Sequence, residues 1–435
     1  MLDELREAAA RQRRQRALKS LVLGCKRLLS GRGQMNGTPV ARDLIERLDI
    51  LPDDQLDGFF DYLANDLSPD PQTVLRRARA YAENPGAAEL IALTRAAEPA
   101  RQELLRRLNR TPGGTATVLR LRRVLLKRLP RRPELAALEA DLLHLLSSWF
   151  NPGFLQMKRV DWNSPAQLLE KIILHEAVHE VDGWDDLRRR MQPDRRCFAF
   201  FHPQLPDEPL IFVEVALLPE MPDAIAPLID KNATPLTAED FRVAAFYGIS
   251  NCEPGLRSVS LGNFLIKQVA EHLHHELPRV RTYCTLSPIP GFSAWLRAAP
   301  DLAALPGLGK AALAKLTAAR ATLEQASGGD LGALQSPTLL EALDAAAQDA
   351  LLALAAAYLG HASPTPAGDP VARFHLDNGA RLERLNPRGN MSPAGLRQSF
   401  GLMVNYLYDL DRIESSHAKF RNGAVARSRA VSGLI

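Results

Sequence analysis

Apolar residues over roughly the first 150 positions recur at the spacing of helices that bury one face. The clearest run is Leu56, Phe59, Phe60, Leu63 and Leu67. Segments rich in proline and glycine interrupt these runs, as at residues 111–114. The pattern predicts an all-α helical bundle over residues 1–152, and this bundle contains no obvious cluster of reactive side chains.

After residue 152 the pattern changes to short runs rich in β-branched and aromatic residues. These predict strands at residues 197–201, 210–218, 241–249, 280–286 and 371–376. Turns are expected at residues 205–208 and 377–379, and helices at residues 262–275 and 393–408. Residues from about 298 to 362 are rich in Ala and Leu and predict a helical insertion. Residues 153–435 are therefore expected to form a mixed α/β domain, which makes the whole chain α+β.

The composition of the 435 residues excludes several classes of protein. A hydrophobic fraction of 46% and a charged fraction of 24% are typical of a folded chain. A net charge of only +4 argues against a nucleic-acid partner, and the basic run at 120–132 is interpreted as a solvated helix face. The four cysteines form no CxxC pair, and no apolar run reaches the ~18 residues that span a bilayer. A cytoplasmic protein without a membrane partner is expected.

His175-Glu176-Ala177-Val178-His179 is the most conspicuous motif. On a helix, the two histidines would share a face and could bind zinc, with Glu176 as a base. A zinc site needs a third ligand, and His202 lies in no known arrangement for one. Two incidental histidines on a surface helix are favoured over a zinc protease.

Two further regions carry candidate chemistry. Residues 255–267 lie between a predicted strand and helix, where small residues and free N–H groups favour a phosphate and Arg257 adds a charge. Ser287 ends a predicted strand and is followed by two prolines that fix its loop. His375 lies beside the turn at 377–379, where an imidazole can transfer protons near neutral pH. Only the fold can bring Ser287 and His375 together.

Taken together, these segments resemble the malonyl-CoA decarboxylase family. The shared strings are Glu176-Ala177-Val178-His179, Arg195-Arg196-Cys197-Phe198, Glu208-Pro209-Leu210, Gly255-Leu256, Leu261-Gly262, Phe264-Leu265-Ile266-Lys267, Leu286-Ser287-Pro288-Ile289-Pro290-Gly291-Phe292, Phe374-His375-Leu376, Asn378-Gly379-Ala380 and Gly401-Leu402-Met403-Val404-Asn405-Tyr406. They cover about residues 150–412 in the family's order. The chain departs from the family at Ser260, where some members carry an acid, and at residues 386–390.

The resemblance implies a helical N-terminal domain and a GNAT-like catalytic domain that converts malonyl-CoA to acetyl-CoA and carbon dioxide in fatty acid metabolism. It places Ser287 and His375 on the family's catalytic pair. Its malonyl-CoA-binding segment falls on Arg257, Ser258, Val259, Ser260, Leu261, Gly262 and Asn263. It also implies a homo-oligomer, commonly a tetramer, and no zinc.

Decarboxylation of a malonyl thioester leaves an enolate whose carbonyl is the electron sink, so no cofactor is expected beyond the CoA of the substrate. His375 is expected to protonate carbon with a pKa near the working pH, and Ser287 to hydrogen-bond the substrate. Whether Ser287 is a nucleophile or a relay stays open. A CoA-dependent acyltransferase and a malonyl-CoA sensor without turnover are the alternatives.

Overall fold

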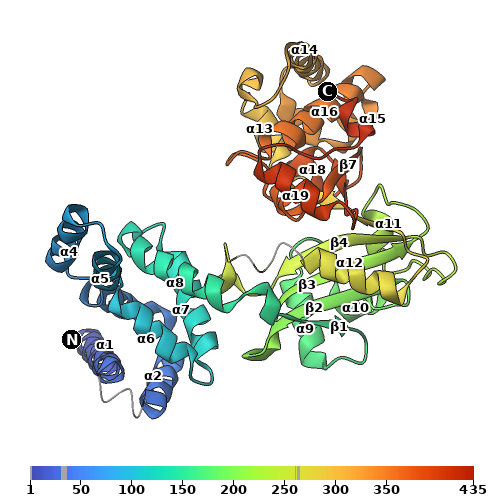
Figure 1. The fold of residues 1–435 in the computed structure, drawn as a ribbon. Coiled ribbons are helices and arrows are strands. Elements are labelled where there is room, and N and C mark those ends of the chain that lie inside the picture. The colour runs from blue at the N-terminus through green and yellow to red at the C-terminus, as the bar shows by residue number, and fades with distance from the viewer. Residues whose placement is uncertain (1, 31–36, 260, 262–264) are drawn as a thin grey trace. The chain divides into compact units, whose positions relative to one another are not determined.

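The computed structural model describes residues 2–30, 37–259, 261 and 265–435. Contacts between residues divide the chain into two compact units. Figure 1 shows the fold, coloured by residue number from blue to red. Unit 1 comprises residues 1–156, 201–209 and 253–261. Unit 2 comprises residues 157–200, 210–252 and 262–435. Unit 1 therefore takes two short segments from later in the chain.

Helices make up the described N-terminal part of unit 1, as the apolar spacing predicts. They are α1 (Leu2–Leu29), α2 (Gly37–Ile50), α3 (Asp57–Asp61), α4 (Pro71–Glu83), α5 (Ala87–Ala97), α6 (Ala100–Asn109), α7 (Gly114–Arg128) and α8 (Ala136–Trp149). Local sequence sets their ends. Asp70 accepts a hydrogen bond from the backbone N–H of Thr73 at the start of α4, and Gly113 precedes α7 with a φ of 83°.

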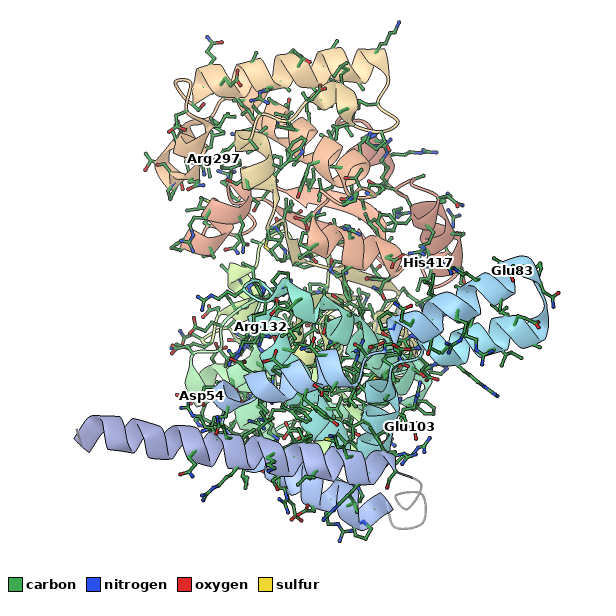
Figure 2. All side chains as sticks on the ribbon, turned by 90° about the vertical axis from the view of Figure 1, so that its left-hand side faces the viewer. Asp54, Glu83, Glu103, Arg132, Arg297 and His417 are labelled. Carbon is green, nitrogen blue, oxygen red and sulfur yellow. The ribbon has the colours of Figure 1, made fainter. Side chains whose placement is uncertain are left out.

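Buried leucines and phenylalanines form the core of unit 1, and ion pairs tie its helices together. Phe59 and Phe60 of α3 are fully buried. Arg101 of α6 pairs with Asp141 of α8 at 2.5 Å, and both side chains are largely buried. Arg132, labelled in Figure 2, follows α7 and pairs with Asp61 and Glu134. The buried Arg101 is tolerated because Asp141 matches its charge and Ser68 accepts a further hydrogen bond from its guanidinium.

A mixed sheet organises the second part of the chain. In the described residues its eight strands are β1 (Gln156–Val160), β2 (Arg195–His202), β3 (Leu205–Leu218), β4 (Val243–Asn251), β5 (Thr282–Thr285), β6 (Ser287–Pro288), β7 (Arg381–Asn386) and β8 (Met403–Leu407). Their order is β1-β2-β3-β4-β5-β8-β6, and β7 pairs with β8. Neighbouring strands β3 and β4 are antiparallel, whereas β4 and β5 are parallel. The expected α+β class, with a mixed α/β domain after a helical one, is confirmed.

Unit 2 also contains helices, which lie between and after the strands in the sequence. They are α9 (Ala166–His175), α10 (Gly183–Arg190), α11 (Ala226–Ile229), α12 (Leu265–Glu276), α13 (Phe292–Arg297), α14 (Lys310–Ala326), α15 (Pro337–Ala342), α16 (Ala345–Ala357), α17 (Pro370–Asp377), α18 (Pro393–Ser399), α19 (Ile413–Arg421) and α20 (Arg429–Ser432). Figure 1 shows α12 along the sheet. The ring centroids of His272 in α12 and Phe198 in β2 lie 5.3 Å apart. None of the described helices is both long and apolar enough to cross a membrane.

Three local predictions were wrong, each for a physical reason. Residues 371–376 lie in α17, because Asp369 caps a helix that Pro370 begins. Residues 393–408 form α18 and then β8, because Phe400 and Gly401 take left-handed conformations that end the helix. The turn between β2 and β3 lies at residues 203–204 rather than 205–208. Pro206 is tolerated near the start of β3, where proline is least disruptive.

Candidate active site

The parallel strands β4 and β5 separate at the position of Ser287. Their pairing runs from Val243↔Thr282 to Phe246↔Thr285, and one more hydrogen bond joins Leu286 N–H to the carbonyl of Phe246. Beyond it, β4 continues to Asn251, whereas Ser287 and Pro288 pair with β8 instead. Ser287 is therefore the first side chain at the fork between the two strands.

The last turn of α17 carries His375, and Asp369 fixes this helix. One carboxylate oxygen of Asp369 accepts hydrogen bonds from Val371 N–H and Ala372 N–H at 3.0 Å each. The other accepts from Gly291 N–H at 2.9 Å. Gly291 ends the proline-rich loop that follows Ser287, so one buried carboxylate connects the serine loop to the histidine helix.

Ser287 and His375 form a direct hydrogen bond. Ser287 Oγ lies 3.0 Å from His375 Nε2, and Tyr408 Oη lies 2.9 Å from His375 Nδ1. Ser287 Oγ also donates to Thr285 Oγ1 at 2.9 Å. With this donor direction, the neutral imidazole carries its proton on Nε2 and accepts from Tyr408 at Nδ1. The fold thus links residues 88 positions apart into one chain of polar groups.

Burial determines the charge of this pair. Ser287 is 4% exposed and His375 is 3% exposed. Desolvation lowers the pKa of His375 to about 3, so the free protein holds a neutral imidazole at neutral pH. The expectation of a pKa near the working pH is therefore wrong for the unliganded site. Burial likewise raises the pKa of Tyr408 well above its usual value, which keeps its hydroxyl protonated.

Several residues of this site were not identified from the sequence. Tyr406 stacks on the imidazole of His375 with ring centroids 4.7 Å apart, and Tyr408 approaches it edge-on. The Tyr406 hydroxyl is buried without a hydrogen-bond partner among the described residues. Alternate residues of a strand share a face, so Tyr406 and Tyr408 would have been candidates if residues 403–407 had been predicted as a strand. Asp369-Pro370 was a visible helix-start signal.

The predicted malonyl-CoA segment lies mostly in unit 1. Arg257 and Ser258 are exposed, Val259 and Leu261 are buried, and Ser258 has a φ of 65°. Ser260, Gly262 and Asn263 lie outside the described residues. Arg122 of α7 donates to the carbonyls of Gly255 at 2.6 Å and Arg257 at 2.8 Å. This buried guanidinium fixes the backbone on which the exposed Arg257 side chain is presented.

The segment His175–His179 does not form the helical zinc motif. Helix α9 ends at His175, so the two histidines do not share a helical face. Glu176 accepts hydrogen bonds from the N–H groups of Val178 and His179 and from the hydroxyl of Ser250. Burial and the charge of Arg190 lower the pKa of His179 to about 4. In the described part of the chain, no group of three or more His, Cys, Asp or Glu is placed to hold a metal.

A second buried polar cluster lies beside this segment. Arg190 is buried between Asp186, at 2.9 Å, and Glu214, at 3.3 Å. Glu214 of β3 lies opposite Gly248 of β4, and a Cβ at Gly248 would collide with its carboxylate. Burial, together with Glu176, raises the pKa of Glu214 to about 8 against the opposing effect of Arg190. This cluster holds strands and α10 together and contains neither Ser287 nor His375.

Comparisons with known proteins agree with the motifs. Residues 153–435 match the family model "Malonyl-CoA decarboxylase C-terminal domain", and residues 67–150 match "Malonyl-CoA decarboxylase N-terminal domain". Mitochondrial malonyl-CoA decarboxylases of Anser anser anser and Mus musculus are each 37% identical to the chain, over 340 and 328 residues. These matches cover 74% and 72% of this chain and 66% of each relative, just under two thirds of their length.

A solved structure of malonyl-CoA decarboxylase from Rhodopseudomonas palustris is 46% identical and superposes with a TM-score of 0.82 over 96% of this chain and 99% of that one. The structure from Agrobacterium vitis is 43% identical, with a TM-score of 0.80 over 95% of this chain and 99% of that one. The family model alone spans well over half of the chain, so the resemblance seen in the motifs is confirmed. The chain belongs to the malonyl-CoA decarboxylase family.

Proposed function

We propose that the protein converts malonyl-CoA to acetyl-CoA and carbon dioxide, with Ser287 and His375 as the reacting pair. The observation that carries the proposal is the 3.0 Å contact between Ser287 Oγ and His375 Nε2 at the fork of β4 and β5, in a chain of this family. Where the strands part, their backbone N–H and C=O groups are no longer paired with each other and could bond an extended pantetheine arm. The thioester would then reach Ser287. Residues 257–263 stay the segment that the family resemblance assigns to malonyl-CoA binding.

The chemistry requires stabilisation of an enolate followed by protonation of carbon. When carbon dioxide leaves, the electron pair of the broken C–C bond moves into the thioester carbonyl. Because the substrate supplies this electron sink, the proposal needs no metal or organic cofactor. Each donor aimed at the enolate oxygen contributes on the order of 3 kcal/mol to transition-state stabilisation. Ser287 is placed to be one such donor, and it is only 4% exposed to solvent.

The low pKa of His375 indicates how the proton arrives. A malonyl carboxylate bound beside a neutral imidazole stabilises the imidazolium form and raises its pKa. His375 would thus take up one proton as the substrate binds. It would transfer that proton to the α-carbon as carbon dioxide departs and return to the neutral form that Tyr408 holds by hydrogen bonding. Ser287 needs no covalent intermediate in this scheme, because its hydroxyl acts as a hydrogen-bond donor to the thioester oxygen.

The direct test is to incubate the purified protein with malonyl-CoA and measure acetyl-CoA and carbon dioxide. We expect both products in equal amounts without any acceptor. Malonyl transfer to an added amine, with no carbon dioxide, would instead identify an acyltransferase. Binding of malonyl-CoA without turnover would identify a sensor and contradict the proposal.

A further inference from the structure

A cavity of about 300 Å³ lies in unit 2 away from the Ser287–His375 hydrogen bond. It is lined by Gly379, Arg381, Leu407, Asp409, Arg412, Ser415, Ser416, Lys419, Ala426 and Arg427. These residues come from the turn that leads into β7 and its first residue, from the end of β8 with the loop after it, from α19 and from the segment before α20. His417, labelled in Figure 2, marks α19 and interacts with Asp377 at the end of α17. The cavity is thus built by four segments of one unit.

Positive charge dominates the lining, with four cations against the single carboxylate of Asp409. Arg381 pairs with Glu383 at 2.7 Å, and Arg412 lies 3.6 Å from Asp409. Within the described residues, neither Lys419 nor Arg427 has a carboxylate at ion-pair distance. The lining therefore carries charge that its own acids do not neutralise.

The partner of Arg427 is a neutral histidine. Nε2 of His361 accepts a hydrogen bond from Arg427 Nη1 at 3.0 Å, while Nδ1 donates to the carbonyl of Pro306 at 2.9 Å. Burial, and then the charge of Arg427, lower the pKa of His361, which keeps the ring neutral. His361 thus orients the guanidinium without cancelling its charge. Ser416 adds a hydroxyl group to the lining, whereas the hydroxyl of Ser415 donates to the carbonyl of Arg412 at 2.9 Å.

We infer that this cavity binds a phosphate monoester. Arginine and lysine together with hydroxyl donors are the groups that recognise a phosphate dianion. A volume of about 300 Å³ also accommodates the small organic group to which the phosphate is attached. The phosphate belongs either to a separate metabolite or to the ribose of CoA itself, since CoA carries a phosphate monoester there.

The site lies close in sequence to the reacting pair. Leu407 is the last residue of β8, between Tyr406 and Tyr408, and it lines the cavity. Gly379 follows the helix that carries His375. An occupant would restrain the same strand and helix end that position the imidazole. Binding at the cavity is therefore expected to influence turnover as well as stability.

Inorganic phosphate is the probe for this site, titrated calorimetrically into the full-length protein at constant ionic strength. We expect saturable binding that weakens on the order of tenfold or more in the double variant Arg412→Gln/Lys419→Gln. Both side chains are exposed, so their loss should leave folding intact. The matched control is Arg421→Gln/Arg429→Gln, which removes two exposed cations outside the lining and should bind phosphate normally. Absence of saturable binding, or equal affinity in both double variants, would overturn the inference.

A second, kinetic measurement identifies the source of the phosphate. This measurement, unlike the calorimetric titration, requires that the protein decarboxylate malonyl-CoA as proposed. Michaelis constants are compared for malonyl-CoA and for its analogue lacking the ribose phosphate. If Arg412→Gln/Lys419→Gln abolishes the preference for the phosphorylated form, the cavity holds the substrate's own phosphate. If the preference persists while phosphate binding is lost, the ligand is a separate metabolite. A protein without decarboxylase activity would still give a result in the calorimetric titration.

Discussion

At the scale of single residues, the environment of His375 decides its chemistry. The ring is stacked on Tyr406, hydrogen-bonded to Tyr408 and Ser287, and closed to solvent. Nothing charged contacts it in the described structure, so desolvation is the sole cause of its lowered pKa. A neutral imidazole in this position is poised to gain a proton when an anionic group binds beside it.

Substitution of the pair tests this description. We expect Ser287→Ala and His375→Ala each to fold, to bind a CoA ligand and to lose at least ~100-fold in turnover. The double variant should be little worse than either single variant, since the two groups act as one unit. Turnover is measured for all three variants, with circular dichroism as the folding control. Losses that simply multiply would show that Ser287 and His375 act independently.

Arg257 is a different case, because its side chain is exposed and its backbone is held by Arg122. We expect Arg257→Ala to raise the Michaelis constant about tenfold with little change in turnover, as a phosphate contact stabilises ground state and transition state alike. Arg123→Ala is a suitable control, since Arg123 pairs with Glu253 near the same segment. An unchanged Michaelis constant for Arg257→Ala would remove this residue from the binding site.

At the scale of elements, the sequence predicted more of the sheet than of the segments around His375. Strands β2 to β5 follow from runs of branched and aromatic residues, and the predicted strand at residues 280–286 puts Ser287 near the observed end of β5. The fork between β4 and β5 was not predicted from the sequence. Helix α17 was not predicted, because its eight residues are too few to show a repeating helical spacing of apolar side chains. Its start depends on capping by Asp369. The approach of His375 to Ser287 depends on pairing across 88 residues, which no local pattern encodes.

The end of α9 leads to a prediction about metal content. Because α9 stops at His175, this residue and His179 lack the shared helical face of a zinc motif. We expect the purified protein to carry no stoichiometric zinc and its activity to withstand EDTA. Elemental analysis before and after chelation provides the measurement. One equivalent of zinc, together with activity lost on chelation and restored by zinc, would refute this expectation.

The buried Glu214 of β3 predicts a dependence of stability on pH. Its folded pKa of about 8 lies above the ordinary value of 4.5, so the folded state retains a proton that the unfolded state releases between these pH values. The contribution of Glu214 to the free energy of unfolding is fully present below about pH 4.5, and it is lost as the pH rises toward 8. We expect the stability of the wild type relative to Glu214→Gln to fall by on the order of a few kcal/mol between pH 5 and 8.

Denaturant unfolding at several pH values measures this difference. Glu220→Gln serves as the matched control, because Glu220 follows the same strand but is exposed. A difference between wild type and Glu214→Gln that stays constant from pH 5 to 8 would show that Glu214 is ionised throughout.

At the scale of the whole molecule, unit 1 presents an unusual pair of helices. Helices α4 and α5 pack against each other, and neither has a buried residue although every residue in them is described. Glu83, labelled in Figure 2, lies at the end of α4. Leu75, Leu90 and Ile91 are between 45% and 51% exposed. Neighbouring exposed apolar side chains on one hairpin are typical of a surface that another chain covers.

We therefore expect the α4–α5 hairpin to lie in a subunit contact. The family resemblance implies a homo-oligomer, commonly a tetramer, which we propose as the assembly. Light scattering after size-exclusion chromatography should give about four times the mass of one chain. The double variant Leu90→Asp/Ile91→Asp should shift the population to smaller species, because it places charges in an apolar contact. Arg79→Asp/Arg95→Asp is the matched control on the same two helices, and circular dichroism checks that both variants keep their helices. A tetramer that survives Leu90→Asp/Ile91→Asp unchanged would place the contact elsewhere, and a wild-type monomer would contradict the assembly itself.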